Sequence, residues 1–142
     1  MEGRPQGLAE KSRLILVDSS VWVDFFSTSP GRAGAELRRM IEESEPFALT
    51  GVVVAEVLQG LTRDAAQIEQ FLRQWEMLEP AGFETYRSAA VIYRAARGRG
   101  IALTTIDTLI ASIALEHRAT VFTLDQDFSR IALFTGLALY RF

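Results

Sequence analysis

Short apolar runs alternate along the chain with stretches in which apolar residues recur every three or four positions. The runs predict strands at 14–17, 47–50, 77–79, 121–124 and 137–140, because a strand covered by helices on both faces is apolar throughout. The helical spacing predicts helices at 20–26, 33–43, 52–58, 62–75, 83–97 and 106–117. This alternation predicts an α/β fold, a three-layer α/β/α sandwich with a central, mostly parallel sheet.

Length and composition are those of one globular domain. The chain has 142 residues, of which 49% are hydrophobic and 23% charged, and a chain of this size buries about two thirds of its unfolded surface. We expect residues 1–13, which are polar and lack the order of a secretory signal, to form a flexible tail, and residues 14–142 to form the domain. No apolar run reaches the roughly 20 residues of a bilayer span. Because cysteine is absent, a reducing cytoplasm is compatible, and we expect a cytoplasmic protein with no membrane partner.

The first predicted strand ends on a carboxylate, Asp18. In open α/β sheets, ligands bind just beyond the carboxyl ends of the strands, which favours a site role for Asp18. Aspartate is also a favoured N-cap residue, so the same position is equally well explained as the start of the next helix. This stretch alone leaves both interpretations open.

Three further acids stand where they would meet Asp18. Asp107 and Asp125 lie where apolar chain meets a helix start or a turn, so each is also a candidate cap. Glu56 is the only charge between residues 47 and 59 and therefore needs a partner or a site. If the strands before Asp18 and Asp125 are neighbours, and the helices carrying the other two acids begin at the same sheet edge, four carboxylates converge. Such carboxylates repel one another unless a positive charge intervenes.

Neither of the residues best suited to neutralise these acids is well placed. Lys11 is the one lysine, and His117, the one histidine, falls at the far end of its predicted helix. A divalent cation is therefore the expected counter-charge, and ligation by carboxylate oxygens alone suits Mg²⁺ or Mn²⁺ rather than zinc. Such a cation acidifies water and stabilises charge on a phosphate. The predicted reaction is metal-dependent hydrolysis of phosphodiester bonds.

The net charge of −3 argues against a general affinity for nucleic acid, but it does not exclude a local basic patch. Arg87, Arg94 and Arg97 cluster on one face of the predicted helix 83–97 and are candidate contacts to an RNA backbone. A solvated helix face explains these arginines at least as well.

Four motifs together resemble a PIN domain and, more narrowly, the VapC toxins of bacterial toxin–antitoxin pairs. In order they are residues 16–22 (LVDSSVW), 55–60 (AEVLQG), 107–112 (DTLIAS) and 123–128 (TLDQDF). The resemblance covers about residues 14–140. The chain departs from the common pattern at Ser112, where alanine is usual, and at Thr104-Thr105, where a proline often precedes the third acid. Neither departure touches a proposed ligand.

The resemblance implies an endoribonuclease that depends on Mg²⁺, with Mn²⁺ as a substitute, and that arrests growth by cutting RNA. It implies a catalytic acidic quartet of Asp18, Glu56, Asp107 and Asp125, with the metal held by the three aspartates of that set and by Asp127. It also gives supporting roles to Ser19 and Thr123. As partners it implies a second copy of the chain and a VapB-type antitoxin whose C-terminal segment blocks the acidic cleft.

Two other protein classes that place acids at strand ends need residues that this sequence lacks. A receiver-like signalling module needs a lysine near its last strands, and none lies beyond Lys11. A dehalogenase-type phosphatase needs Asp-x-Asp after its first strand, whereas residues 18–20 are DSS. A PIN-like module that binds RNA or protein without catalysis is a third alternative. The intact quartet argues against it without excluding it.

Overall fold

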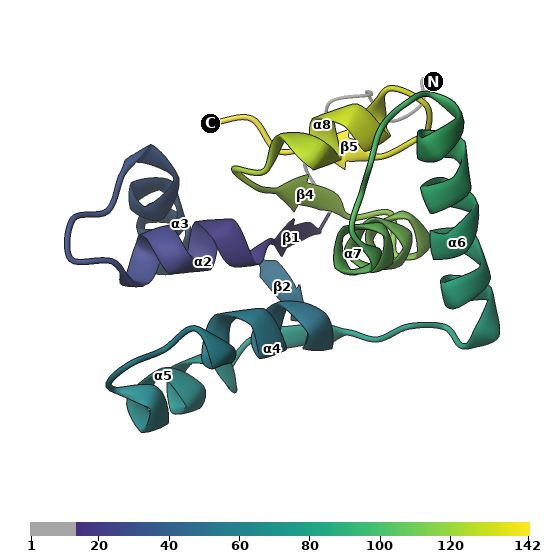
Figure 1. The fold of residues 1–142 in the computed structure, drawn as a ribbon. Coiled ribbons are helices and arrows are strands. Elements are labelled where there is room, and N and C mark those ends of the chain that lie inside the picture. Colours follow the sequence, from purple (N-terminus) through teal and green to yellow (C-terminus); the bar gives the residue numbers. More distant parts are fainter. Residues whose placement is uncertain (1–13) are drawn as a thin grey trace, which may run out of the picture.

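The computed structural model describes residues 14–142, and a sheet of five strands lies at its centre (Figure 1). The strands are β1 (Ile15–Val17), β2 (Phe47–Thr50), β3 (Glu76–Leu78), β4 (Thr120–Phe122) and β5 (Ala138–Leu139). Their order across the sheet is β3-β2-β1-β4-β5, and every neighbouring pair is parallel. The predicted α/β class is confirmed. The predicted tail, residues 1–13, lies outside the described residues.

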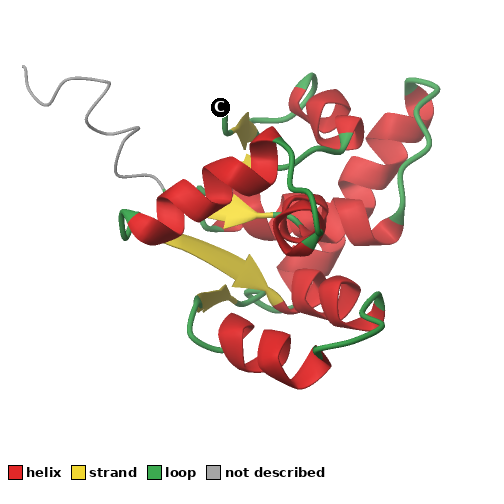
Figure 2. Cartoon of the chain, turned by 90° about the vertical axis from the view of Figure 1, so that its left-hand side faces the viewer, coloured by secondary structure: helices red, strands yellow, loops and turns green. Residues whose placement is uncertain are grey.

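Helices cover the sheet on both faces. Within the described chain they are α2 (Ser19–Phe26), α3 (Arg32–Glu42), α4 (Gly51–Gln59), α5 (Ala65–Leu72), α6 (Phe83–Gly98), α7 (Thr105–Glu116) and α8 (Gln126–Ala132). In Figure 1, α2 and α3 lie on one side of the sheet and α6 and α7 on the other. The view in Figure 2 shows strands enclosed by helices in the same way. The three predicted layers are present.

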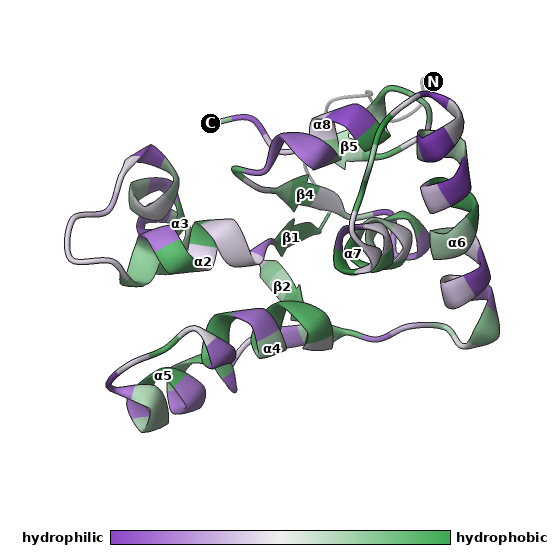
Figure 3. Cartoon of the chain, viewed as in Figure 1, coloured by the Kyte–Doolittle hydropathy of each residue, from purple (hydrophilic) through white to green (hydrophobic). Residues whose placement is uncertain are grey.

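The two inner strands next to the site are fully buried, which explains their apolar sequence. Leu16, Val17, Val121 and Phe122 have no exposed surface, and β1 and β4 are among the most hydrophobic segments in Figure 3. Trp22 on α2 is also fully buried, in an aromatic cluster with Phe25, Phe26, Phe47 and Phe71. This packing fixes α2 against the sheet directly after β1.

Threonine hydroxyls cap the starts of α4 and α7. The Thr50 hydroxyl accepts a hydrogen bond from the Val53 N–H at 3.4 Å, and the Thr104 hydroxyl accepts one from the Asp107 N–H at 3.1 Å. Each bond satisfies a backbone donor that the first helical turn leaves unpaired. Within residues 14–142, no helix combines the length and apolar character that crossing a bilayer requires.

Some element boundaries predicted from the sequence are wrong, and one helix was not predicted. The helix expected from residue 62 begins at Ala65, because Asp64 has a left-handed backbone with φ of 58°. The strand expected to reach residue 124 ends at Phe122, where Thr123 turns into the site. Helix α8 was missed because its seven residues give less than two full periods of apolar spacing.

Candidate active site

Asp18 lies at the carboxyl end of β1, beside the end of β4. The two strands pair in parallel with Val17 opposite Phe122, and the Asp18 N–H donates to the Phe122 carbonyl at 2.9 Å. Asp18 occupies the N-cap position of α2, but its side chain makes no capping bond. The hydroxyls of Ser20 and Thr123 instead each donate to its Oδ2 at 2.8 Å. With 3% of its surface exposed, Asp18 is a fixed acceptor and not a helix cap.

Three more carboxylates gather close to one another. One oxygen each from Asp107, Asp125 and Asp127 lies within 4.8 Å of the other two. Asp107 is in the first turn of α7, Asp125 is the N-cap of α8, and Asp127 is in the first turn of that helix. Unlike Asp18, Asp125 does cap, because its Oδ1 accepts from the Asp127 N–H at 2.9 Å. We call Asp107, Asp125 and Asp127 the acid cluster.

The electrostatic effect of this gathering is concentrated on Asp107, which is 9% exposed. Burial is the largest cause that raises the pKa of Asp107, to about 7, and the charge of Asp125 is the next. The charges of Asp18 and Asp127 act in the same direction, and a hydrogen bond from the Thr104 side chain opposes them. Asp18 therefore lies near enough to influence the acid cluster. A group of carboxylates in this state favours a bound cation.

Glu56 is held on the opposite side of Asp18 from β4. The Ser19 hydroxyl, at the start of α2, donates to Glu56 Oε1 on α4 at 2.9 Å. Glu56 thus has a polar partner, and it lies outside the three-oxygen group of the acid cluster. Ser19 and Thr123, the two hydroxyl residues expected near the site, contact different acids.

Three residues of the site were not predicted as such from the sequence. The Ser20 hydroxyl contacts Asp18 and accepts from the Leu124 N–H at 2.9 Å. Thr104 caps α7 by accepting from the Asp107 N–H, and its side chain also lowers the pKa of Asp107. Arg130 donates to Asp127 Oδ1 at 2.7 Å, so a positive charge does reach one of the acids. Its i+3 spacing from Asp127 is a usable signal only once α8 is known to be a helix.

The arginines singled out on α6 lie outside the acid cluster. Arg87 donates to Glu84 at 2.8 Å, and Arg97 donates to the Tyr93 hydroxyl at 3.4 Å. Arg94 lines a shallow hollow between α6 and the start of α7. All three are exposed on α6, so their proposed contact with RNA stays a prediction.

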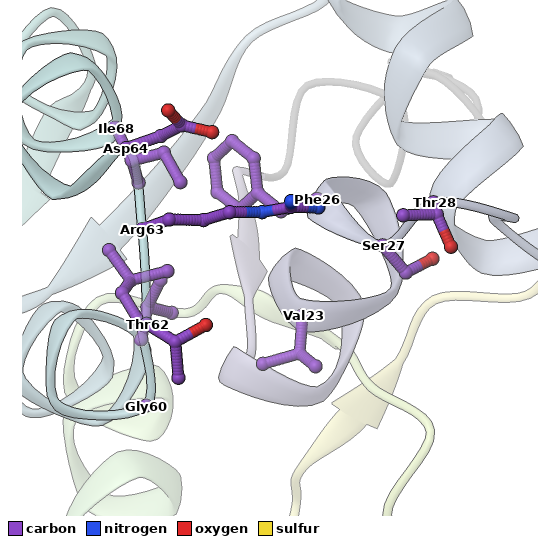
Figure 4. A pocket seen from close by; sticks show the side chains of 11 residues that line it. Val23, Phe26, Ser27, Thr28, Gly60, Thr62, Arg63, Asp64 and Ile68 are labelled. Atoms are coloured by element: carbon purple, nitrogen blue, oxygen red, sulfur yellow. The ribbon is translucent and has the colours of Figure 1, made fainter.

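A separate hollow of about 320 Å³ lies between the C-terminal ends of α2 and α4 and the start of α5 (Figure 4). Its lining includes the apolar side chains of Val23, Phe26 and Ile68 together with Arg63. None of Asp18, Glu56 and the acid cluster lines it. This hollow is therefore distinct from the site of the carboxylates.

Comparison with known proteins gives a consistent result. Residues 15–133 match the PIN domain family model. The chain is 35% identical over 128 residues to VapC ribonuclease Mb1587 of Mycobacterium bovis and to ribonuclease VapC11 of Mycobacterium tuberculosis, covering 87% of this chain and 96% of each relative. Among solved structures, VapBC2 from Rickettsia felis bound to a promoter DNA fragment matches with a TM-score of 0.71 at 20% identity, covering 91% of this chain and 98% of that one. DNA-bound VapBC from Salmonella typhimurium matches with a TM-score of 0.72 at 17% identity, over 90% and 97% of the two chains. The chain belongs to the PIN domain family and, within it, to the VapC ribonucleases.

Proposed function

We propose that this chain is a metal-dependent endoribonuclease and the toxin of a toxin–antitoxin pair. The observation that carries the proposal is the acid cluster, whose three oxygens lie within 4.8 Å of one another beside buried Asp18. The identity of 35% to proteins named ribonucleases supports the same activity.

We propose Mg²⁺ as the resident ion, with Mn²⁺ as a substitute. The donor set fits a hard cation, because the acid cluster and Asp18 offer carboxylate oxygens and no sulfur or imidazole lies among them. Burial first, and the charge of Asp125 second, raise the pKa of Asp107, and a bound cation would offset both effects. When bound, the ion would acidify water and stabilise charge on the phosphate.

Residues of the chain would orient the metal-binding carboxylate and accept a proton. Ser20 and Thr123 hold the Asp18 carboxylate in one orientation by two hydrogen bonds. Glu56, oriented by Ser19 and outside the acid cluster, is the carboxylate we assign as acceptor of the proton that the attacking water loses.

The direct test is cleavage of RNA by the purified protein with and without the cation. We expect cleavage in Mg²⁺ or Mn²⁺, complete loss in EDTA, and recovery when Mg²⁺ is restored in excess. Gel analysis of an end-labelled single-stranded RNA measures this. Absence of cleavage under every cation condition would overturn the proposal and leave the catalytically silent binding module as the better interpretation.

A VapB-type antitoxin is the proposed protein partner. Solved relatives of the same fold include VapBC complexes, among them those from Rickettsia felis and Salmonella typhimurium. An acidic site of this kind is blocked most simply by a basic side chain of the partner, which would take the place of the cation. We place this pair in the cytoplasm, where the RNA substrate is found.

We propose that a second copy of the chain covers the aromatic stripe of α6, formed by Phe83, Tyr86, Ala90 and Tyr93. Phe83 is 79% and Tyr86 52% exposed, and exposed apolar stripes of this kind mark interfaces. One stripe meeting its own copy about a two-fold axis is the commonest arrangement of homodimers.

A charge placed on this stripe is expected to produce monomers. We expect Tyr86→Glu to halve the mass that light scattering records for the wild-type protein, because an ionised side chain would lose its hydration in the interface. Val91→Glu is the matched control, since Val91 is 40% exposed on the same helix but outside the stripe. A dimer that survives Tyr86→Glu would place the interface elsewhere.

A further inference from the structure

We propose that a hollow next to the acid cluster binds the nucleotide adjacent to the scissile phosphodiester, with two arginines holding its phosphate. The inference rests on the proposed ribonuclease activity. The hollow has a volume of about 350 Å³, within the range of sites that hold one small ligand. Its lining includes Arg32, Thr123, Asp125, Gln126, Ser129, Tyr140, Arg141 and Phe142. We call it the C-terminal hollow.

The C-terminal hollow shares a wall with the acid site. Thr123 and Asp125 line it, and the Thr123 hydroxyl donates to Asp18 while accepting from the Asp125 N–H at 2.9 Å. A phosphodiester held at the carboxylates therefore has this hollow as its immediate neighbour. The next nucleotide of an RNA strand can enter it without leaving the surface of the protein.

Two arginines give the far wall a positive charge. Arg32, at the start of α3, donates from Nη2 to the Phe142 carbonyl at 2.8 Å, and its guanidinium lies over the Phe142 ring at 5.4 Å. A guanidinium carries five N–H donors, and this bond uses one. Arg141, which is exposed, lines the same hollow and is the second basic residue there. In a chain of net charge −3, this pair offers local attraction for phosphate next to acids that repel it.

The remaining lining suits a ribonucleotide better than a free anion. Phe142 is 40% exposed, its ring packs on Phe122 with centroids 4.9 Å apart, and the Arg32 guanidinium lies over it. The surface offered to a base is therefore the ring together with its stacked guanidinium. Stacking on such faces is a general mode of binding single-stranded RNA. Gln126 and Ser129 are exposed on α8 and carry the donors and acceptors that can contact the edge of a base.

The test compares cleavage kinetics of the full chain with those of the double variant Arg32→Gln/Arg141→Gln. We expect the KM for a short single-stranded RNA to rise about tenfold or more, because each lost contact is a charge-assisted hydrogen bond. We expect kcat to stay within about threefold of wild type, and the salt dependence of binding to weaken by about one to two phosphate contacts. Arg73→Gln is the matched control, since Arg73 is the exposed C-cap residue of α5, does not line the hollow, and pairs only loosely with Glu69 at 3.7 Å.

Mn²⁺ affinity in the absence of RNA separates this proposal from its alternatives. Wild-type affinity in the double variant is expected, and an equal fall in Mn²⁺ affinity would show that the arginines only support the acid site. If the wild type cleaves RNA and the double variant has the same KM and the same salt dependence, the proposed nucleotide site is wrong. The ribonuclease activity itself would still stand. If the double variant loses only its binding to the antitoxin, the C-terminal hollow binds protein and not RNA, and the proposal is wrong. If the double variant does not fold, Gln126→Ala must change the base preference beside the cut, and an unchanged preference would likewise overturn the proposal.

Discussion

Replacing Asp18 by asparagine is expected to abolish cation-dependent RNA cleavage, with a fall in kcat of about a thousandfold or more. Asparagine has the same shape, and its carbonyl oxygen can still accept from Ser20 and Thr123, so the fold should persist. The negative charge of a buried carboxylate that we propose as a metal ligand is lost. A thousandfold fall corresponds to about 4 kcal/mol of lost transition-state stabilisation.

The measurement is single-turnover cleavage of a labelled RNA in saturating Mg²⁺, with circular dichroism to verify the fold. Asp64→Asn is a matched control, because Asp64 is an exposed loop residue outside the site and asparagine tolerates its left-handed backbone. That variant should cleave as the wild type does. Wild-type cleavage by Asp18→Asn would remove Asp18 from the catalytic set.

The second large effect concerns the stability of the cation-free protein as the pH changes. The pKa of Asp107 in the folded protein is about 7, above its ordinary value of 3.8, because burial and neighbouring carboxylates favour the neutral acid. Between these values the folded state holds a proton that the unfolded chain has released. The resulting stability is therefore present at low pH and is lost as the pH rises through about 7.

We expect the melting temperature of the protein in EDTA to fall between pH 5 and pH 8, and Asp107→Asn to remove much of this fall. At pH 8 the variant should melt about 3 to 8 °C above the wild type, the shift that 1 to 2 kcal/mol causes in a domain of this size. At pH 5 the difference should be smaller, and it should disappear only near pH 3.8, where Asp107 becomes neutral in the unfolded chain as well.

Added Mg²⁺ provides an internal check on this prediction. It should raise the melting temperature of the wild type at pH 8 by neutralising the acid cluster, and it should stabilise Asp107→Asn much less. Other carboxylates also titrate in this range, so only the difference between the two proteins reports on Asp107. If the melting temperatures of the two proteins differ by the same amount at every pH, Asp107 keeps its ordinary pKa in the folded protein.

The parallel sheet could be predicted from the sequence because it depends on local pattern, and the same pattern places Asp18, Asp107 and Asp125 at strand ends or helix starts. The role of Asp18 could not be decided in this way. Its position satisfies the rules for a helix cap, and the residue that shows otherwise, Thr123, lies 105 positions away. Only the pairing of β1 with β4 brings the two together.

The expectation that no basic side chain balances the acids was incomplete for a related reason. It was based on the scarcity of lysine and histidine, and it missed Arg130, which pairs with Asp127. That pair depends on α8, a helix too short for its spacing to be recognised. Asp125 differs from Asp18, because its side chain both caps α8 and belongs to the acid cluster.

The hydroxyl of Thr123, which joins Asp18 to the backbone of Asp125, has a consequence for how the protein is made. Asp18 is synthesised 105 residues before Thr123, which follows β4 and orients Asp18. A nascent chain that has folded its first two strands still lacks the wall that orients Asp18. Synthesis in this order completes the hydrogen bonds around Asp18 only after β4 has paired with β1.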